Sequence, residues 1–325
     1  MTLDTLLYEP ELARVAPALG ALVRPAIRLT TTPQEADSAP VGTSKFGGAP
    51  DLPAGVPWPV ARLHAPAPSD AFKQAHADLP TLPPDGRVAL PFLGQIALAE
   101  ARPYDDQGLL PAKGLLSFFY NPVAYWSDAQ GGEVRDNRTG MRYRAYGYDD
   151  PGNWSVLYHP DTSTLTRAAP PAALAPLARY APAALTFAVE PTLPAIETCF
   201  IGAAGSAEGR VVLTEDEWAT YAELRGEARA DRRIHQLLGH PDTTQPFAME
   251  RAYTALRPRF FPALPQRATA TTAAWQQELE GARLLLQVDE LRGGPRFGRE
   301  GRAFFFIREV DLREGDFARV WLVAP

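Results

Sequence analysis

The sequence predicts an α+β fold, with mixed but mainly antiparallel sheets that arise from an internal duplication with pseudo-twofold related halves. Candidate strands come in groups with helices inserted between them, an order that is typical of α+β proteins. Three short motifs also occur twice in the same order along the 325 residues, which is the signature of a duplicated unit. We expect one domain, 1–325, with one half at about 26–160 and the other at about 184–325.

The three repeated motifs are a glycine–proline turn, an apolar strand that holds one glutamine, and an aromatic strand. They occupy 47–51, 94–96 and 114–119 in the first half, and 238–242, 286–288 and 301–306 in the second. The spacing from the turn proline to the glutamine is 45 positions in the first half, Pro50 to Gln95, and 46 in the second, Pro241 to Gln287. This agreement in order and spacing predicts the duplication.

Hydrophobic periodicity places the elements of the first half. Leucine and valine at spacings of three and four predict a helix over 11–23, although Pro17 kinks or shortens it. Alternation predicts a strand over 26–30. Apolar runs predict strands over 90–98 and 114–120, and aromatic residues with polar turns predict a meander of strands over 125–160.

The second half begins with a strand over 184–189 and the clearest helix signal in the chain. Thr214 and Glu217 form a capping box, and the helix or broken pair that follows is expected to run to Leu238 and end at Gly239. A short helix is expected over 275–281, and strands over 283–289, 303–310 and 319–323. The proline-rich stretches 50–91 and 168–194 are expected to be extended covering segments.

Composition excludes several classes of protein. The net charge is −6 and no basic block is present, which argues against nucleic-acid binding. Cys199 is the only cysteine, so no intramolecular disulfide can form, and nothing indicates an oxidising compartment. Acidic residues precede the first basic residue, Arg14, unlike in a signal peptide, and no apolar stretch is long enough to span a membrane. We therefore expect a soluble cytoplasmic protein.

The two glutamines allow two interpretations. A buried primary amide must satisfy its donors and acceptors, and each glutamine achieves this most simply by clamping the backbone of its own glycine–proline turn. The alternative is that Gln95 and Gln287 face a shared cleft between the halves. On that interpretation the candidate ligand-binding residues are those of the two turns and their neighbours: Lys45, Gly47, Gly48, Asp51, Gln95, His235, His240, Asp242, Gln287 and Asp289.

No motif predicts catalysis, a cofactor or a metal. His235, His240, Asp242 and Asp289 form the densest group of titratable residues, but their spacing matches no standard metal-ligand pattern. Lys45 beside two glycines suggests an anion site, without a recognised phosphate-binding fingerprint. Cys199 lies in an apolar context, where a thiol is usually inert.

A second candidate surface follows the glycine-rich turn at 131–132. Tyr143, Tyr146, Tyr148 and Trp154 are interleaved with arginines and form a possible interaction surface for a sugar, a base or a protein. The same alternation fits a half-buried strand with a charged outer face.

The turn and strand motifs also carry a resemblance to a known family. A Lys-Phe-Gly-Gly-x-Pro-Asp-x-Pro segment at 45–53 and an Asp-Leu-x-x-x-Asp-Phe segment at 311–317 resemble those of the YwqG-like family. The resemblance spans most of the chain and implies a mixed α+β domain from bacteria, with no accepted reaction. The chain departs from the family at Arg299, where relatives tend to carry an acid.

These observations favour a non-catalytic binding protein, with an unknown protein or small-molecule partner bound between the two halves. One alternative is an immunity-type inhibitor of a toxin. Another is a hydrolase that uses His235, His240, Asp242 and Asp289.

Overall fold

A computed structural model describes most of the chain. The described residues are 9–35, 37–62, 83–122, 152–172, 174, 179–196, 198, 200–203, 211–227, 233–243, 280–298 and 301–324. Within them the fold is α+β and mostly antiparallel, as expected.

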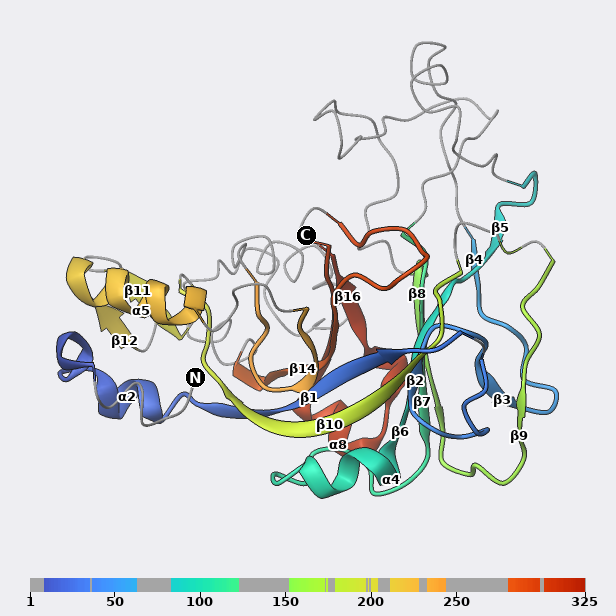
Figure 1. Ribbon diagram of the computed structural model, residues 1–325, viewed down its shortest axis with the longest axis horizontal. Helices are drawn as coiled ribbons and strands as arrows, with labels where there is room; N and C mark the ends of the chain where they lie inside the picture. The colour runs from blue at the N-terminus through green and yellow to red at the C-terminus, as the bar shows by residue number, and fades with distance from the viewer. Residues whose placement is uncertain are drawn as a thin grey trace, which may run out of the picture.

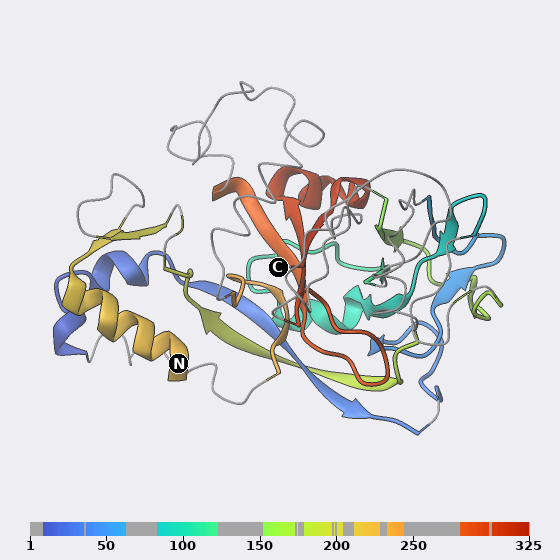
Figure 2. The ribbon, with the colours of Figure 1, turned by 90° about the horizontal axis from the view of Figure 1, so that it is seen from above.

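A ten-stranded antiparallel sheet forms the body of the molecule (Figures 1 and 2). Its strand order is β16-β15-β14-β13-β1-β10-β2-β6-β7-β8. The strands are β1 (Arg24–Pro33), β2 (Lys45–Phe46), β6 (Phe92–Ala97), β7 (Leu115–Tyr120), β8 (Trp154–His159), β10 (Ala183–Thr192), β13 (His235–Leu238), β14 (Ala282–Val288), β15 (Ala303–Arg308) and β16 (Trp321–Val323). The two longest strands, β1 and β10, pair along their whole length at the centre of the sheet.

Shorter elements flank this sheet. Two-stranded pairs form between β3 (Asp51–Pro53) and β9 (Leu165–Arg167), and between β4 (Val60–Arg62) and β5 (Arg87–Ala89). The helical segments along the sheet are α4 (Leu98–Ala101), η2 (Arg102–Tyr104), α8 (Glu309–Glu314) and η4 (Phe317–Arg319). None of the helices in the described residues is both long and apolar enough to cross a membrane.

Strand β7 is buried on both faces of the sheet. All six of its residues are buried, because alternate side chains face different apolar clusters. Phe118 packs in the large core with Phe305 of β15, at 5.2 Å between ring centroids. Phe119 packs in a second cluster with Trp58 and Leu52, residues of the segments that cover the other face. A strand buried on both faces is expected to be a nearly continuous apolar run.

The sheet is nearly closed, because its two edges approach each other. The indole Nε1 of Trp154 in β8 donates a hydrogen bond of 3.0 Å to the backbone oxygen of Val320, next to β16. Tyr158 of β8 also packs against Phe317, with 5.0 Å between ring centroids. These contacts join residues more than 150 positions apart in the sequence.

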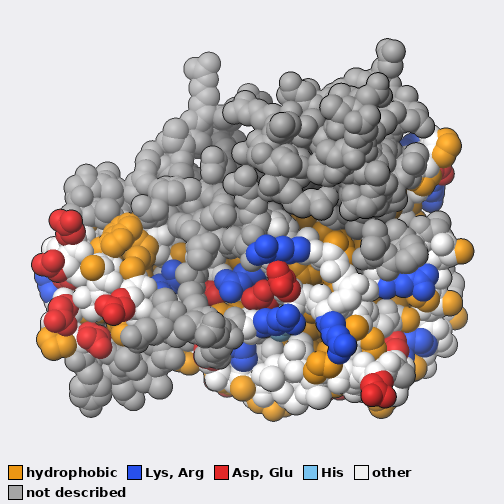
Figure 3. All heavy atoms as spheres, turned by 45° about the horizontal axis from the view of Figure 1, so that its top comes forward, with side chains coloured by type: hydrophobic (Ala, Val, Ile, Leu, Met, Phe, Trp, Pro, Cys, Tyr) orange, Lys and Arg blue, Asp and Glu red, His pale blue; other side chains and the backbone are white. Residues whose placement is uncertain are grey.

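A small lobe projects from the end of the β1–β10 pair (Figure 1). It consists of η1 (Pro10–Leu12), α2 (Ala16–Gly20), α5 (Glu215–Glu227) and a parallel pair, β11 (Ile201–Ala203) with β12 (Val211–Leu213). These elements share one apolar cluster, which includes Leu12, Leu19 and Tyr221. The exposed acids of the lobe, Glu11, Glu215, Asp216 and Glu223, agree with the red side chains on that lobe in Figure 3.

The capping box at the start of α5 is confirmed. The backbone N–H of Thr214 donates to Glu217 at 2.8 Å, and that of Glu217 donates to Thr214 Oγ1 at 3.3 Å. Glu217 also accepts a hydrogen bond from Arg14. This hydrogen bond is the main reason that the pKa of the Glu217 carboxyl is lowered to about 2.

The expected end of that helix at Leu238 is wrong. Helix α5 ends at Glu227, and His235–Leu238 is strand β13, which pairs with both β1 and β14. Gly239 does adopt the left-handed conformation, with φ of 71°. Sequence reasoning attributed this glycine to a helix C-terminus, whereas it belongs to a turn that follows a strand.

Two other boundaries are corrected. The expected strand over 303–310 ends at Arg308, where α8 begins, and Gly315 ends that helix in the left-handed conformation with φ of 73°. The expected helix over 11–23 is divided into η1 and α2, with Pro17 in the first turn of α2, where proline is tolerated. Most of the expected meander over 125–160, and most of the expected helix over 275–281, lie outside the described residues.

We predict that Trp154→Phe weakens the closure of the sheet. The substitution leaves the Val320 carbonyl without its buried donor, so the free energy of unfolding should fall by about 1–3 kcal/mol. Urea unfolding measures the change. Trp218→Phe, at a partly buried tryptophan of the small lobe, is the matched control, and an equal small effect of both substitutions would contradict this account of the closure.

Candidate functional site

The first glycine–proline turn requires its glycines. Gly47 and Gly48 have φ of 62° and 70°, in the left-handed region that side chains disfavour. A Cβ atom on Gly47 would also lie 2.2 Å from the backbone oxygen of Ala181. The turn therefore packs tightly against the segment that leads into β10.

Gln95 clamps this turn, as the first interpretation of the sequence predicts. Its side chain is completely buried. The amide oxygen accepts a hydrogen bond of 2.9 Å from the backbone N–H of Asp51, and the amide nitrogen donates to the backbone oxygen of Thr43 at 2.8 Å and to Asp51 Oδ2 at 2.6 Å. The amide oxygen and both N–H donors of Gln95 are thus hydrogen-bonded to residues of the first half.

A carboxylate packs against the outside of the first turn. Asp37 accepts hydrogen bonds from the Lys45 ammonium at 2.9 Å and from the backbone N–H of Ala49 at 2.7 Å, and its ion pair with Arg167 is 2.9 Å long. Lys45 is only 1% exposed. Burial lowers the pKa of its ammonium, and Asp37 partly opposes that shift. We call Asp37, Lys45, Asp51, Gln95 and Arg167 the first turn cluster.

The second turn has the same backbone conformation and the same clamp. Leu238 and Gly239 have φ of 58° and 71°. Gln287, which is also completely buried, accepts a hydrogen bond of 2.9 Å from the backbone N–H of Asp242 and donates one of 3.0 Å to the backbone oxygen of Ile234.

The two candidate histidines are buried and hydrogen-bonded to backbone. His235 Nδ1 accepts from the backbone N–H of Asp289 at 3.1 Å, and His240 Nε2 lies 2.7 Å from the backbone oxygen of Leu22. Burial lowers the pKa of His235 to about 4 and the pKa of His240 well below its ordinary value. Because a carbonyl only accepts hydrogen bonds, the neutral His240 ring carries its proton on Nε2.

The candidate aspartates hold an arginine. Arg302 forms an ion pair of 2.8 Å with Asp242 and another of 3.1 Å with Asp289. Asp289 Oδ2 also accepts a hydrogen bond from the backbone N–H of Ile234. Within the ranges that the structure describes, no group of three or more histidine, cysteine, aspartate or glutamate side chains is arranged to hold a metal ion.

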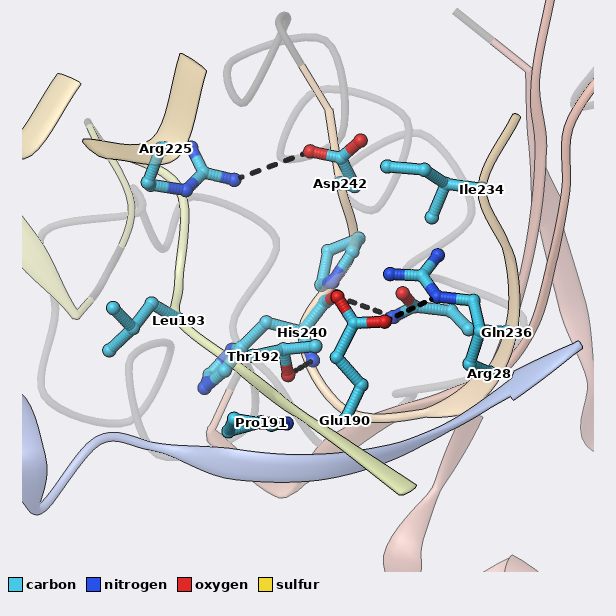
Figure 4. A pocket seen from close by; sticks show the side chains of 11 residues that line it. Arg28, Glu190, Pro191, Thr192, Leu193, Arg225, Ile234, Gln236, His240 and Asp242 are labelled. Carbon is cyan, nitrogen blue, oxygen red and sulfur yellow. Dashed lines mark hydrogen bonds and ion pairs between the residues drawn. The ribbon is translucent and has the colours of Figure 1, made fainter. Parts of the chain in front are cut away.

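A pocket lies between the second turn, the central strands and the small lobe (Figure 4). Its cavity volume is about 50 Å³. Its polar lining comes from five parts of the chain: Arg28 of β1, Glu190 and Thr192 of β10, Arg225 of α5, Gln236 of β13, and His240 and Asp242 of the second turn. We call it the junction pocket.

Arg28 is the unusual residue of the junction pocket. Its side chain is 11% exposed, and its Nε donates to Glu190 at 2.7 Å. Its Nη1 is buried and has no hydrogen-bond partner among the described residues. Arg225 lies on the opposite wall, where it forms a long ion pair of 3.8 Å with Asp242 (Figure 4). A buried arginine nitrogen without a partner is costly.

The structure divides the ten candidate ligand-binding residues between two places. Lys45, Gly47, Gly48, Asp51 and Gln95 belong to the first turn and the cluster around it, which β1 and β10 separate from the second turn in the sheet order. Of the others, only His240 and Asp242 line the junction pocket. His235, Gln287 and Asp289 make the backbone contacts described above. The glutamines therefore do not meet in a shared cleft.

Sequence reasoning missed five polar residues of the junction pocket: Arg28, Glu190, Thr192, Arg225 and Gln236. They lie on four different elements, and no local motif contains two of them. Cross-strand pairing places Arg28 opposite Gln236, and such a pair becomes visible only when the register is known.

The aromatic interaction surface is not supported where it is described. Trp154 is a core residue, 9% exposed, and its indole is hydrogen-bonded within the fold. Tyr143, Tyr146 and Tyr148 lie outside the described residues, as do Cys199 and Arg299.

We predict that Gln95→Leu and Gln287→Leu each lower the free energy of unfolding by about 2 kcal/mol or more. Each substitution leaves one buried and one partly buried backbone group without a hydrogen-bond partner. Denaturant titration measures the loss. Gln107→Leu, at an exposed loop position, is the control and should change stability by less than about 0.5 kcal/mol; similar values for all three would contradict the clamp.

We predict that the buried histidines make the fold sensitive to acid. Their folded-state pKa values lie below the unfolded-state value of about 6.5, so the unfolded chain binds more protons between those values. Stability is therefore full above about pH 6.5 and should fall as the pH drops towards 4. His240→Gln keeps a donor for the Leu22 carbonyl and should show a smaller decrease in the urea midpoint over this range. An unchanged decrease would show that His240 does not titrate with unfolding.

Comparison with known proteins gives the family of the chain. A family model described as a domain of unknown function, DUF1963, matches residues 44–324. A search of curated proteins gave no significant match. The matched range contains both turns and every strand of the large sheet except β1. The narrower resemblance to the YwqG-like family stays a prediction. Because the match covers most of its length, this chain belongs to the DUF1963 family.

Proposed function

We propose that this protein is a non-catalytic binding protein whose ligand site is the junction pocket. The observation that carries the proposal is the buried Nη1 of Arg28, which has no partner in the described residues. An unpaired buried donor costs about 1–3 kcal/mol, and the cost is larger when the donor belongs to a charged group such as a guanidinium. A bound ligand that accepts a hydrogen bond there recovers this free energy.

The location and size of the pocket support the same proposal. The pocket lies where the small lobe meets the large sheet, and ligand sites occur preferentially at such junctions. Its volume of about 50 Å³ admits a small polar group, whereas a drug-sized ligand needs several hundred Å³. A larger molecule or a protein partner would therefore insert only one side chain or terminus.

The contacts of the second turn count against the hydrolase alternative. A general base needs a ring nitrogen within reach of substrate, and one ring nitrogen of each histidine, His235 Nδ1 and His240 Nε2, already contacts a backbone group. Asp242 and Asp289 are paired with Arg302. These interactions favour a structural role for the four side chains at the second turn.

We also propose that the two halves arose by duplication. Outward from β1 and β10, one side of the sheet contains β13, β14, β15 and β16, and the other contains β2, β6, β7 and β8, in chain order on both sides. The alignment of the two turns pairs Phe46 with Leu237. Phe46 lies opposite Ala183 of β10, and Leu237 lies opposite Ile27 of β1, so Ala183 and Ile27 are equivalent positions. Exchange of β1 and β10 then turns the Ile27–Val189 pair into the pair of Pro33 with Ala183, which the two strands form. The register thus supports a pseudo-twofold axis near Thr30.

We predict that at least one small polar compound raises the melting temperature of the protein through Arg28. The panel is acetate, acetamide, inorganic phosphate, methylammonium, guanidinium and glycerol, each compared with sodium chloride at equal ionic strength. Binding to the folded state alone raises stability by mass action. Arg28→Lys keeps the charge beside Glu190 but removes the guanidinium fork, and should abolish the shift.

The control for this experiment is Arg62→Lys, at an exposed position of β4, which should behave as the unmodified protein does. The proposal is wrong if no compound raises the melting temperature, or if the shifts are the same in Arg28→Lys.

A further inference from the structure

We infer that the ligand of the junction pocket is a carboxylate group. The inference rests on the proposed function, since it names the chemistry of the ligand at that same site. It follows from three features: a carboxylate that the chain itself places against the first turn, the arrangement of arginines in the pocket, and the size of the cavity.

The first turn shows what the outside of such a turn binds. Asp37 lies there between a cation on the turn strand, Lys45, and a cation from another element, Arg167, and it also accepts the backbone N–H of Ala49. The carboxylate is held closely enough that a Cβ atom on Gly48 would lie 2.4 Å from Asp37 Oδ2. An internal carboxylate thus completes the first turn cluster.

The second turn has different side chains at the positions that surround Asp37 in the first turn. In the alignment of the turns, Gln236 corresponds to Lys45, and its amide nitrogen donates to the backbone oxygen of His240 at 2.8 Å. The cation lies on the paired position of the next strand, at Arg28, opposite Gln236. The backbone N–H of His240 corresponds to the backbone N–H of Ala49 in the first turn, but it donates to Thr192 Oγ1. No described carboxylate contacts both Arg28 Nη1 and Arg225.

The charged side chains of the pocket favour an anion at one position, beside Arg28 Nη1. Glu190 accepts from Arg28 Nε, which leaves Nη1 directed away from that bond. Asp242 is already held by Arg302 and faces Arg225. One carboxylate oxygen of a ligand can accept from Arg28 Nη1, with the positive charge of Arg225 on the opposite wall. Planar carboxylates match the guanidinium donors better than spherical anions do.

The acids of the pocket select against other anions. Inorganic phosphate carries more negative charge than a carboxylate at neutral pH and would lie close to Glu190 and Asp242, which repel it. A neutral amide of the same shape lacks the charge that makes a hydrogen bond to arginine strong. Acetate and acetamide therefore form a matched pair of probes, because they differ mainly in charge.

The test is a titration followed by NMR of the arginine side chains of the full-length protein at pH 7. Acetate should shift the Nε–H signal of Arg28 and saturate with a dissociation constant in the millimolar range, as expected for so few atoms. Acetamide and phosphate should bind at least about tenfold more weakly. Arg28→Lys should weaken acetate binding by about tenfold or more, measured on backbone signals of β13, and Arg62→Lys should leave it unchanged.

Two peptides identify the source of the carboxylate. If trialanine binds more tightly than acetate and trialaninamide does not bind, the site takes a peptide C-terminus; if acetate and trialanine bind equally, it takes a free small carboxylate. Both results support the inference. It is overturned if acetamide or phosphate matches acetate, or if only a cation such as guanidinium binds. The proposed function itself fails when no probe from either panel perturbs the pocket signals.

Discussion

The need to satisfy two buried amides organises the whole structure. Gln95 and Gln287 each lie in an apolar run of a strand and have no exposed surface, so the polar atoms of each amide must find partners inside the fold. Each amide finds one on the turn that follows the neighbouring strand, at the N–H of Asp51 or Asp242. The amide therefore fixes the turn, the turn requires residues with positive φ, and the aspartate at its end is positioned to receive an arginine, Arg167 or Arg302.

The two turns share this frame but differ in what lies outside it. At the first turn the chain supplies its own carboxylate, Asp37, and the cluster is closed. At the second turn the corresponding space opens on the junction pocket, and Arg28 keeps a buried nitrogen without a described partner. A fold with two similar frames can thus use one to stabilise itself and the other to bind a ligand. In this account the residues of the repeated motifs stabilise the frame, and the binding residues come from the elements around it.

The sequence predicted those parts of the fold that depend on local patterns. Apolar runs located β6 and β7, and the Thr214–Glu217 box located the start of α5. The clamp could be predicted because an amide in an apolar strand has few ways to pair. The end of α5 was mispredicted, because a glycine with positive φ follows strands as well as helices, and only the pairing of β13 with β1 and β14 decides between them. The junction pocket could not be predicted, since Arg28, Glu190 and Arg225 meet only through register and the docking of the small lobe.

The central claim is that the junction pocket holds a carboxylate between Arg28 and Arg225, whereas the first turn already holds one of its own. A crystal structure of the protein grown with acetate tests this most directly. The account predicts planar density for one acetate within hydrogen-bond distance of Arg28 Nη1, about 2.7–2.9 Å, with Asp37 unchanged at the first turn. An acetate bound elsewhere on the protein, with only water or no density beside Arg28 Nη1, would contradict it.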